Sequence, residues 1–315
     1  MVNSLNNSIH KVLFIVGPTA VGKSDIAIQT AKALDGEIIS ADSMQIYKGM
    51  TIGTAQPTTK EKKGIKHHLI GFLPVSKNYS IFNYRQSVLQ QIQKIIKKGK
   101  TPIVVGGSGL YISAVIDGIS PQPKGSVKLR KRFSLQKKKY GLNYLYQRLK
   151  RIDSKRAAEI HPNDERRIVR ALEIYDQSGK TFTEWRNRRI SLEQCGYRSV
   201  VVGLTMDRER LYKKINLRVL SMVKAGWVKE ARKLRKKKQS TTAKQAMGYN
   251  ELFLHIKGKL SLEDAVIEIQ KNTRHFAKRQ WTWFNRMNYV RWLDVTKSRS
   301  NKVSKQIEGI WKESF

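Results

Sequence analysis

The stretch that decides the fold is residues 17–24, which read Gly17-Pro18-Thr19-Ala20-Val21-Gly22-Lys23-Ser24. It matches the pattern G-x-x-x-x-G-K-[ST], follows a short apolar run at 11–16 and precedes a helical pattern over 23–34. Glycines in such a turn let successive backbone N–H groups face a phosphate, and the helix N-terminus adds partial positive charge. The sequence therefore predicts a phosphate-binding P-loop. A purely structural turn would not need all four defining positions to be filled.

Two side chains of this loop have expected roles. Lys23 would neutralise phosphate oxygens, and Ser24 would bind Mg²⁺. The motif alone also fits an ATP or GTP hydrolase or a kinase, in which Asp42 could help to hold the metal. However, the apolar run at 101–105 ends in glycine instead of aspartate, and no guanine-selecting Asn-Lys-x-Asp occurs in the chain. The hydrolase stays open as an interpretation without further support.

Strand-like and helix-like patterns alternate around the loop. Short β-branched runs predict buried strands at 11–16, 37–41, 101–105 and 199–204. Helical spacing predicts helices at 23–34, 82–98, about 208–237, 261–286 and 304–311. The alternation predicts an α/β fold: a P-loop NTPase-like parallel sheet core flanked by helices.

A basic, helix-rich stretch interrupts this alternation. Residues 119–198 contain 21 Lys or Arg against 8 Asp or Glu, a surplus of +13. A strand pattern that resumes after such a stretch indicates an inserted helical subdomain. We therefore expect a core formed by 1–118 and 199–315, with 119–198 as the insertion.

Charge is the unusual feature of the composition. Lys and Arg total 62 against 24 acidic residues, giving a formal net charge of +38. Such a surplus attracts polyanions, although general lysine enrichment of the surface could explain part of it. The single cysteine, the polar start at 1–10 and the lack of a long apolar run together predict a cytoplasmic protein without a disulfide framework.

Motifs that follow the loop narrow the function. They stand in order at 40–50, 52–55, 67–69, 105–111, 161–164, 166–173, 245–249 and 274–283. They include Ser40-Ala41-Asp42-Ser43-Met44-Gln45, Val105-Gly106-Gly107-Ser108-Gly109, Gln245-Ala246-Met247-Gly248-Tyr249 and Arg279-Gln280-Trp281-Thr282-Trp283. As an ordered set, they resemble the bacterial tRNA dimethylallyltransferases over nearly the whole chain.

The resemblance implies a substrate pair and a cofactor. Dimethylallyl diphosphate, rather than ATP, would occupy the P-loop with Mg²⁺, and the acceptor would be N6 of the adenosine next to the tRNA anticodon. The partner would be the anticodon stem-loop, and we expect a monomer that does not bind membranes.

The resemblance also assigns catalytic roles. Asp42 would be hydrogen-bond acceptor and general base for the amine, while a metal-facing or capping aspartate is the competing interpretation. Thr19, Lys23 and Arg218 would absorb the charge of the departing diphosphate. Arg218 stands in a basic chain, so a surface arginine is a competing interpretation there.

Contacts to tRNA are implied at three places. The flipped adenosine would lie near Asp42, Ser43, Met44, Gln45 and Ser108. The stem-loop backbone would contact Arg166, Arg167, Ile168, Val169 and Arg170, with a further contact at Gln245, Gly248 and Tyr249. Asn250 replaces a basic residue of many relatives and is left out. Trp281 and Trp283 could stack on bases, but helical aromatic residues usually pack inside, and we expect both in the core.

Besides the hydrolase or kinase, two rival functions are weighed against the resemblance. An adenylate isopentenyltransferase would modify a free nucleotide and would not need a basic insertion. A catalytically inactive RNA-binding protein is disfavoured because Lys23, Ser24 and Asp42 are all present.

Overall fold

The computed structural model describes residues 10–314; the polar start predicted at 1–10 lies outside them apart from His10. The chain forms two compact units. We call Met1–Ile116 with Gly196–Phe315 the core unit, and Asp117–Cys195 the inserted unit.

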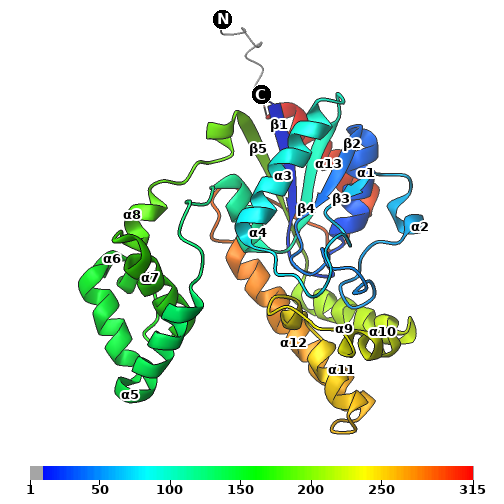
Figure 1. The fold of residues 1–315 in the computed structure, drawn as a ribbon. Helices are drawn as coiled ribbons and strands as arrows, with labels where there is room; N and C mark the ends of the chain where they lie inside the picture. Colours follow the sequence, from blue (N-terminus) through cyan, green and yellow to red (C-terminus); the bar gives the residue numbers. More distant parts are fainter. Residues whose placement is uncertain (1–9, 315) are drawn as a thin grey trace, which may run out of the picture. The chain divides into compact units, whose positions relative to one another are not determined.

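The core unit contains a six-stranded sheet in the order β3-β2-β4-β1-β5-β6 (Figure 1). Its strands are β1 His10–Val16, β2 Gly36–Ser40, β3 His67–His68, β4 Thr101–Gly106, β5 Tyr197–Thr205 and β6 Arg291–Asp294. Every pair of neighbouring strands is parallel. Because all the carboxyl ends point the same way, the loops after β2, β4 and β1 emerge next to one another.

Helices flank this sheet, which confirms the predicted α/β class (Figure 1). The helices of the core unit are α1 Lys23–Ala33, α2 Thr59–Lys62, α3 Ile81–Ile96, α4 Gly109–Ile116, α9 Arg208–Lys224, α10 Trp227–Arg235, α11 Tyr249–Ile256, α12 Leu262–Phe284 and α13 Ser300–Glu313. The helix predicted over 208–237 is in fact α9 and α10. Gly226 has φ 98° between them, a conformation that glycine adopts easily and that ends a helix.

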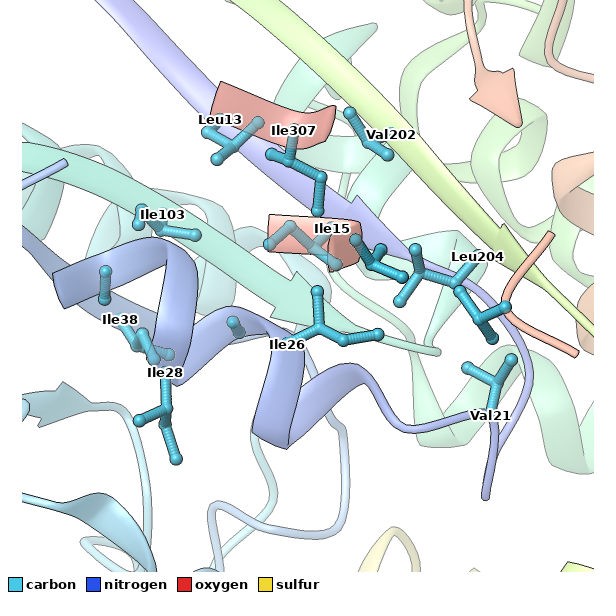
Figure 2. Close-up of a cluster of buried hydrophobic side chains, with 14 of the residues drawn as sticks. Leu13, Ile15, Val21, Ile26, Ile28, Ile38, Ile103, Val202, Leu204 and Ile307 are labelled. Carbon is cyan, nitrogen blue, oxygen red and sulfur yellow. The ribbon is translucent and has the colours of Figure 1, made fainter. Parts of the chain in front are cut away.

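The main hydrophobic cluster lies between one face of the sheet and helices α1 and α13 (Figure 2). Leu13 and Ile15 of β1, Val202 of β5, Ile26 of α1 and Ile307 of α13 are among its buried members. Alternate residues of β1 face this cluster, as the two-residue period of a strand requires. Because α1 packs on the sheet, the position of its first turn is fixed, and so is the position of the loop that precedes it.

The inserted unit is helical. It comprises α5 Val127–Ile152, α6 Ser154–Ala158, α7 Glu165–Ser178 and α8 Phe182–Arg186, and α5 is interrupted at Gly141, where φ is 81°. Its own core includes Phe133, Leu145 and Ile168, all fully buried. The unit thus has the separate hydrophobic centre expected of a subdomain.

Across residues 10–314, no helix combines the length and the apolar character that a bilayer crossing requires.

Candidate active site

The site forms where three neighbouring strands end. Gly17 follows β1, Asp42 follows β2 and Gly107 follows β4, and β4 lies between the other two strands. Ligands of open parallel sheets bind at this edge. Gly106 lets the strands approach closely, because a Cβ there would stand 2.2 Å from the Ala41 carbonyl oxygen.

A pocket of about 340 Å³ opens at this edge, within the core unit. Its polar lining includes the P-loop, Asp42, Gln45, Arg218 and Gln280, and its apolar lining includes Ile28, Ile38, Ile70 and Phe276. Charged and apolar surfaces therefore share one cavity of a size that suits a small ligand.

Lys23 is held by the loop that it belongs to. Its Nζ donates to the carbonyl oxygens of Gly17 at 3.0 Å and Pro18 at 2.7 Å. Burial and, after it, the Arg218 charge lower the pKa of Lys23 to about 7, against the opposing effect of the Asp42 charge. An ammonium has three donors, so one N–H remains for a phosphate oxygen.

Arg218 of α9 lies in the same pocket, although about 200 residues separate it from the P-loop in sequence. Its Nη1 donates to Thr19 Oγ1 at 3.1 Å. Burial lowers its pKa, while the Asp42 and Glu61 carboxylates raise it. Thr19, Lys23 and Arg218 thus form one cationic, hydrogen-bonding end of the pocket.

Asp42 uses one oxygen to hold its own turn. Its Oδ1 accepts from the backbone N–H of Met44 at 2.8 Å and of Gln45 at 3.3 Å. This is the local capping geometry that competes with a catalytic role. Its charge also acts on Lys23 and Arg218 across the pocket. The turn therefore fixes the carboxylate without removing it from the pocket.

Of the residues predicted to contact the adenosine, Asp42 and Gln45 line the pocket, whereas Ser43, Met44 and Ser108 do not. The Ser43 N–H donates to Ser108 Oγ at 3.2 Å, which joins the loop after β2 to the loop after β4. Gln45 lines the pocket, but its amide is engaged: it accepts from Ser40 Oγ and donates to the carbonyls of Thr54 and Ala55. Met44 packs on a hydrophobic cluster.

Other predicted loop residues lie beside the pocket or within the fold. Val21 belongs to the hydrophobic cluster at 1% exposure, and Gly17 and Pro18 contribute the carbonyls that hold Lys23. The pocket lining contains Thr19, Ala20, Gly22, Lys23 and Ser24.

The predicted stem-loop contacts on α7 divide into two groups. Arg166 and Arg167 are exposed, and Arg167 pairs with Asp164 at 3.3 Å. Arg170 instead binds the fully buried Glu173 at 2.7 Å and the Pro123 carbonyl, so it belongs to the structure of the unit. The Ile168 side chain is fully buried and that of Val169 packs beside the same cluster.

The residues predicted to contact tRNA at 245–249 also include both exposed and buried members. Gln245 is exposed, whereas Gly248 and Tyr249 are buried and the Tyr249 hydroxyl donates to Glu230 at 2.7 Å. A Cβ at Gly248 would overlap the Trp227 ring at 2.2 Å. The side chains predicted to contact tRNA at positions 168 and 249 are therefore buried in the protein. The neighbouring Asn250 is exposed.

The prediction that Trp281 and Trp283 are core residues is wrong. They are 44% and 38% exposed. The buried positions of this part of α12 are Ala277, Gln280 and Phe284, which lie on another face of the helix.

The pocket lining includes residues to which the sequence assigned no role, among them Glu61, His67, Phe276 and Gln280. His67 Nδ1 donates to the Ile65 carbonyl at 2.8 Å, and burial lowers its pKa, so its other ring nitrogen is an acceptor. Phe276 and Gln280 stand four residues apart on α12 and both lie in the motif at 274–283, and these two features were the available signals.

Among residues 10–314, no cluster of three or more His, Cys, Asp or Glu side chains could hold a metal ion. The pocket offers the exposed Ser24 hydroxyl. Mg²⁺ commonly takes one or two protein ligands and completes its shell with substrate phosphates and water. The residues therefore fit an ion that is bound together with a phosphorylated ligand.

Comparison with known proteins identifies similar sequences. The family model described as IPP transferase matches residues 45–287. The tRNA dimethylallyltransferase of Carboxydothermus hydrogenoformans is 43% identical over 304 residues, which is 94% of this chain and 96% of that protein. The tRNA dimethylallyltransferase of Bacillus subtilis is 42% identical over 294 residues, 93% of each chain.

Solved structures are similar as well. The full-length tRNA isopentenylpyrophosphate transferase of Bacillus halodurans has a TM-score of 0.71 at 38% identity and covers 96% of this chain and 97% of its own. A eukaryotic dimethylallyltransferase, captured acting on tRNA, has a TM-score of 0.80 at 29% identity, with 96% of this chain and 78% of that chain covered.

Proposed function

The chain belongs to the IPP transferase family, and we propose that it transfers the dimethylallyl group of dimethylallyl diphosphate to N6 of adenosine 37, beside the tRNA anticodon. The resemblance read from the sequence motifs is confirmed by the family match. The observation that carries the proposal is one pocket that joins two cations, a carboxylate and an apolar lining.

The cationic end of the pocket suits the diphosphate. Lys23, Arg218 and the Thr19 hydroxyl converge there, and the N-terminus of α1 begins at Lys23. Helix N-termini and charge-assisted hydrogen bonds both favour phosphate oxygens. Mg²⁺ bound through Ser24 would add charge neutralisation on the leaving diphosphate.

The apolar lining suits the five-carbon tail. Ile28, Ile38 and Ile70 line the pocket near the P-loop helix and β2. Burying five carbons contributes at most about 4 kcal/mol, at roughly 0.8 kcal/mol per methylene. The diphosphate contacts must therefore supply much of the donor affinity. The apolar lining selects a hydrocarbon tail of matching shape.

The reaction breaks the bond between the allylic carbon and the diphosphate oxygen and forms a bond from that carbon to N6. The amine lone pair is delocalised into the adenine ring, so its attack requires removal of a proton. Asp42 accepts this proton, and its turn holds the carboxylate in place. Lys23, Arg218 and Thr19 receive the charge that develops on the diphosphate.

The acceptor would bind on the side of the pocket formed by Asp42 and Gln45. An adenine inside a stacked loop must be extruded before it can react. Asp42 and Gln45 line the pocket, and Ser43 and Met44 stand between them in the chain. The hydrogen bond from the Ser43 N–H to Ser108 joins this turn to the loop after β4, so we expect the adenine to enter beside these residues. Exposed Arg166, Arg167 and Gln245 would contact the stem-loop outside the pocket. A tRNA substrate would place the reaction in the cytoplasm.

The test uses purified protein, dimethylallyl diphosphate, Mg²⁺ and a synthetic anticodon stem-loop. Mass analysis of the digested RNA should show N6-isopentenyladenosine at position 37, and none when position 37 is guanosine. AMP should give no product at the same concentration. Efficient turnover of AMP, or ATP hydrolysis without any transfer, would overturn the proposal.

A further inference from the structure

Gln280 occupies a position between the donor and acceptor sides of the pocket. It lies on α12, is 6% exposed, and uses both ends of its amide. Its Oε1 accepts from the Thr19 N–H at 2.8 Å, and its Nε2 donates to the Gly107 carbonyl at 2.9 Å. One side chain thus joins the P-loop to the loop after β4.

The first of these contacts fixes Thr19. Its backbone N–H binds Gln280 of α12, and its hydroxyl accepts from Arg218 of α9. The Thr19 amide is therefore committed to the protein and is not among the loop donors free for phosphate. Two helices that come late in the chain hold one P-loop residue, which directs the Thr19 hydroxyl toward Arg218.

The second contact fixes the acceptor side. Gly107 precedes Ser108, whose hydroxyl accepts from the N–H of Ser43, the residue after Asp42. A Cβ at Gly107 would lie 2.2 Å from Gln280 Nε2 and 3.2 Å from the Gly17 carbonyl oxygen. Glycine is needed at 107 so that the Gln280 amide can approach. The close fit indicates a selected contact and not an incidental one.

We propose that Gln280 is a positioning residue that sets the distance between the bound diphosphate and the entering adenine. This inference rests on the proposed function. Each side of the pocket keeps its own ligand contacts without Gln280, because Lys23, Arg218 and Asp42 remain. What is lost is their mutual alignment, and a displacement of about 1 Å at a reacting centre can reduce a rate by roughly 100-fold.

The test compares Gln280→Leu, Gly107→Ala and the double variant with the unaltered protein. Gln280→Leu removes both hydrogen bonds at similar volume, and Gly107→Ala displaces the amide without changing it. Gln270→Leu is the matched control: Gln270 is on the same helix and its Nε2 donates to the Asn216 carbonyl of α9 at 3.3 Å, away from the pocket lining. If Gln280→Leu does not fold, Gly107→Ala still tests the contact.

Three quantities are measured on each folded variant: the dissociation constant of inorganic diphosphate, the KM for the stem-loop, and the single-turnover transfer rate. We expect the first two to change less than about threefold, and the rate of either single variant to fall roughly 10- to 100-fold. The double variant should be no slower than the slower of the two single variants, because both substitutions disrupt the same contact. Gln270→Leu should transfer at the unaltered rate.

Two results would overturn the inference. One is a single-turnover rate within threefold of the unaltered protein in both single variants. The other is a loss of diphosphate affinity as large as the loss of rate, which would make Gln280 only a part of the donor site. Absence of transfer by the unaltered protein itself would instead refute the proposed function, and this inference with it.

Discussion

Asp42 holds a turn of the fold and is also the proposed base of the reaction. Its Oδ1 ends the turn after β2 by accepting two backbone N–H groups. Asn at this position keeps an acceptor oxygen for the turn but cannot take a proton. We expect Asp42→Asn to keep the melting temperature and the stem-loop affinity, and to lower the single-turnover rate about 10²- to 10⁴-fold.

Asp42→Ala separates the two duties further. It removes the turn acceptor as well, so it should lower the melting temperature in addition to abolishing transfer. Circular dichroism melts and a filter-binding assay with the stem-loop measure both effects. Transfer by Asp42→Asn at the unaltered rate would remove Asp42 from proton transfer and leave it with the structural duty alone.

Lys23 couples donor binding to protons. Its pKa of about 7 in the free protein means that it is largely neutral at pH 8 and charged at pH 6. A bound diphosphate adds nearby negative charge, which raises the pKa again. Donor binding should therefore take up roughly one proton at pH 8 and almost none at pH 6.

Calorimetry in two buffers of different ionisation enthalpy, without RNA, measures this uptake. Lys23→Met should abolish the proton uptake by the protein at pH 8 and leave only the protons that the ligand itself takes up. Equal uptake in the two proteins would mean that another group titrates.

At the residue scale, local pattern predicted the P-loop and Asp42 but not Gln280. The P-loop residues are adjacent in sequence, so their chemistry is visible in the motif. Gln280 reaches Thr19 across 261 positions, and the motif at 274–283 that contains Gln280 does not reveal this contact. The exposure of Trp281 and Trp283 was missed because helical spacing does not say which face is covered.

At the scale of elements, α10 anchors a loop that lines the pocket. Glu230 of α10 accepts from the backbone N–H groups of Ile52 and Gly53, each at 2.9 Å, and from the Tyr249 hydroxyl at 2.7 Å. This contact holds the loop that ends in Ala55 and Gln56 of the pocket lining. Burial and the Glu230 charge together raise the pKa of Tyr249, so the hydroxyl remains a donor.

Glu230→Ala leaves three partly buried donors without an acceptor. We expect a loss of about 2–4 kcal/mol in the free energy of unfolding, measured by chemical denaturation. Glu308→Ala is the control, because Glu308 forms an ordinary i,i+4 pair with Lys312 and should cost less than about 0.5 kcal/mol. Similar losses in both variants would contradict the anchoring role.

Helix α7 presents two kinds of arginine. Arg166 is exposed, whereas Arg170 serves the buried Glu173, which also accepts from Arg130 and from the Ser126 N–H. Arg166→Ala should reduce the slope of log affinity against log salt for the stem-loop by about 0.9 and leave stability unchanged. Arg170→Ala should lower the melting temperature, because it removes one partner of a buried charge.

Fluorescence anisotropy at several salt concentrations measures the slope, and Lys97→Ala, an exposed site just after α3, controls for general loss of charge. An equal change of slope in Arg166→Ala and Lys97→Ala would show that Arg166 has no specific phosphate contact.

For the whole molecule, the sequence predicted a parallel sheet with flanking helices, but not the strand order. Hydrophobic periodicity marks which segments are strands, while the order β3-β2-β4-β1-β5-β6 depends on how the connections pack. That order places the loops after β1, β4 and β2 side by side. The edge strands β3 and β6, only 2 and 4 residues long, were too short to be predicted.

The net charge of +38 is spread over the whole chain. It should therefore affect the rate at which the protein encounters RNA rather than the rate of the chemical step. If three phosphates are contacted, raising the salt from about 50 to 200 mM should lower kcat/KM for the stem-loop roughly fortyfold. The single-turnover rate at saturating RNA should change less than about twofold, because the pocket is already filled. A stem-loop with guanosine at position 37 should compete with the same salt dependence, since it presents the same backbone. A saturated rate that falls as steeply as kcat/KM would place the salt-sensitive charges at the reacting centre, among Lys23, Arg218 and Asp42, and not on the surface.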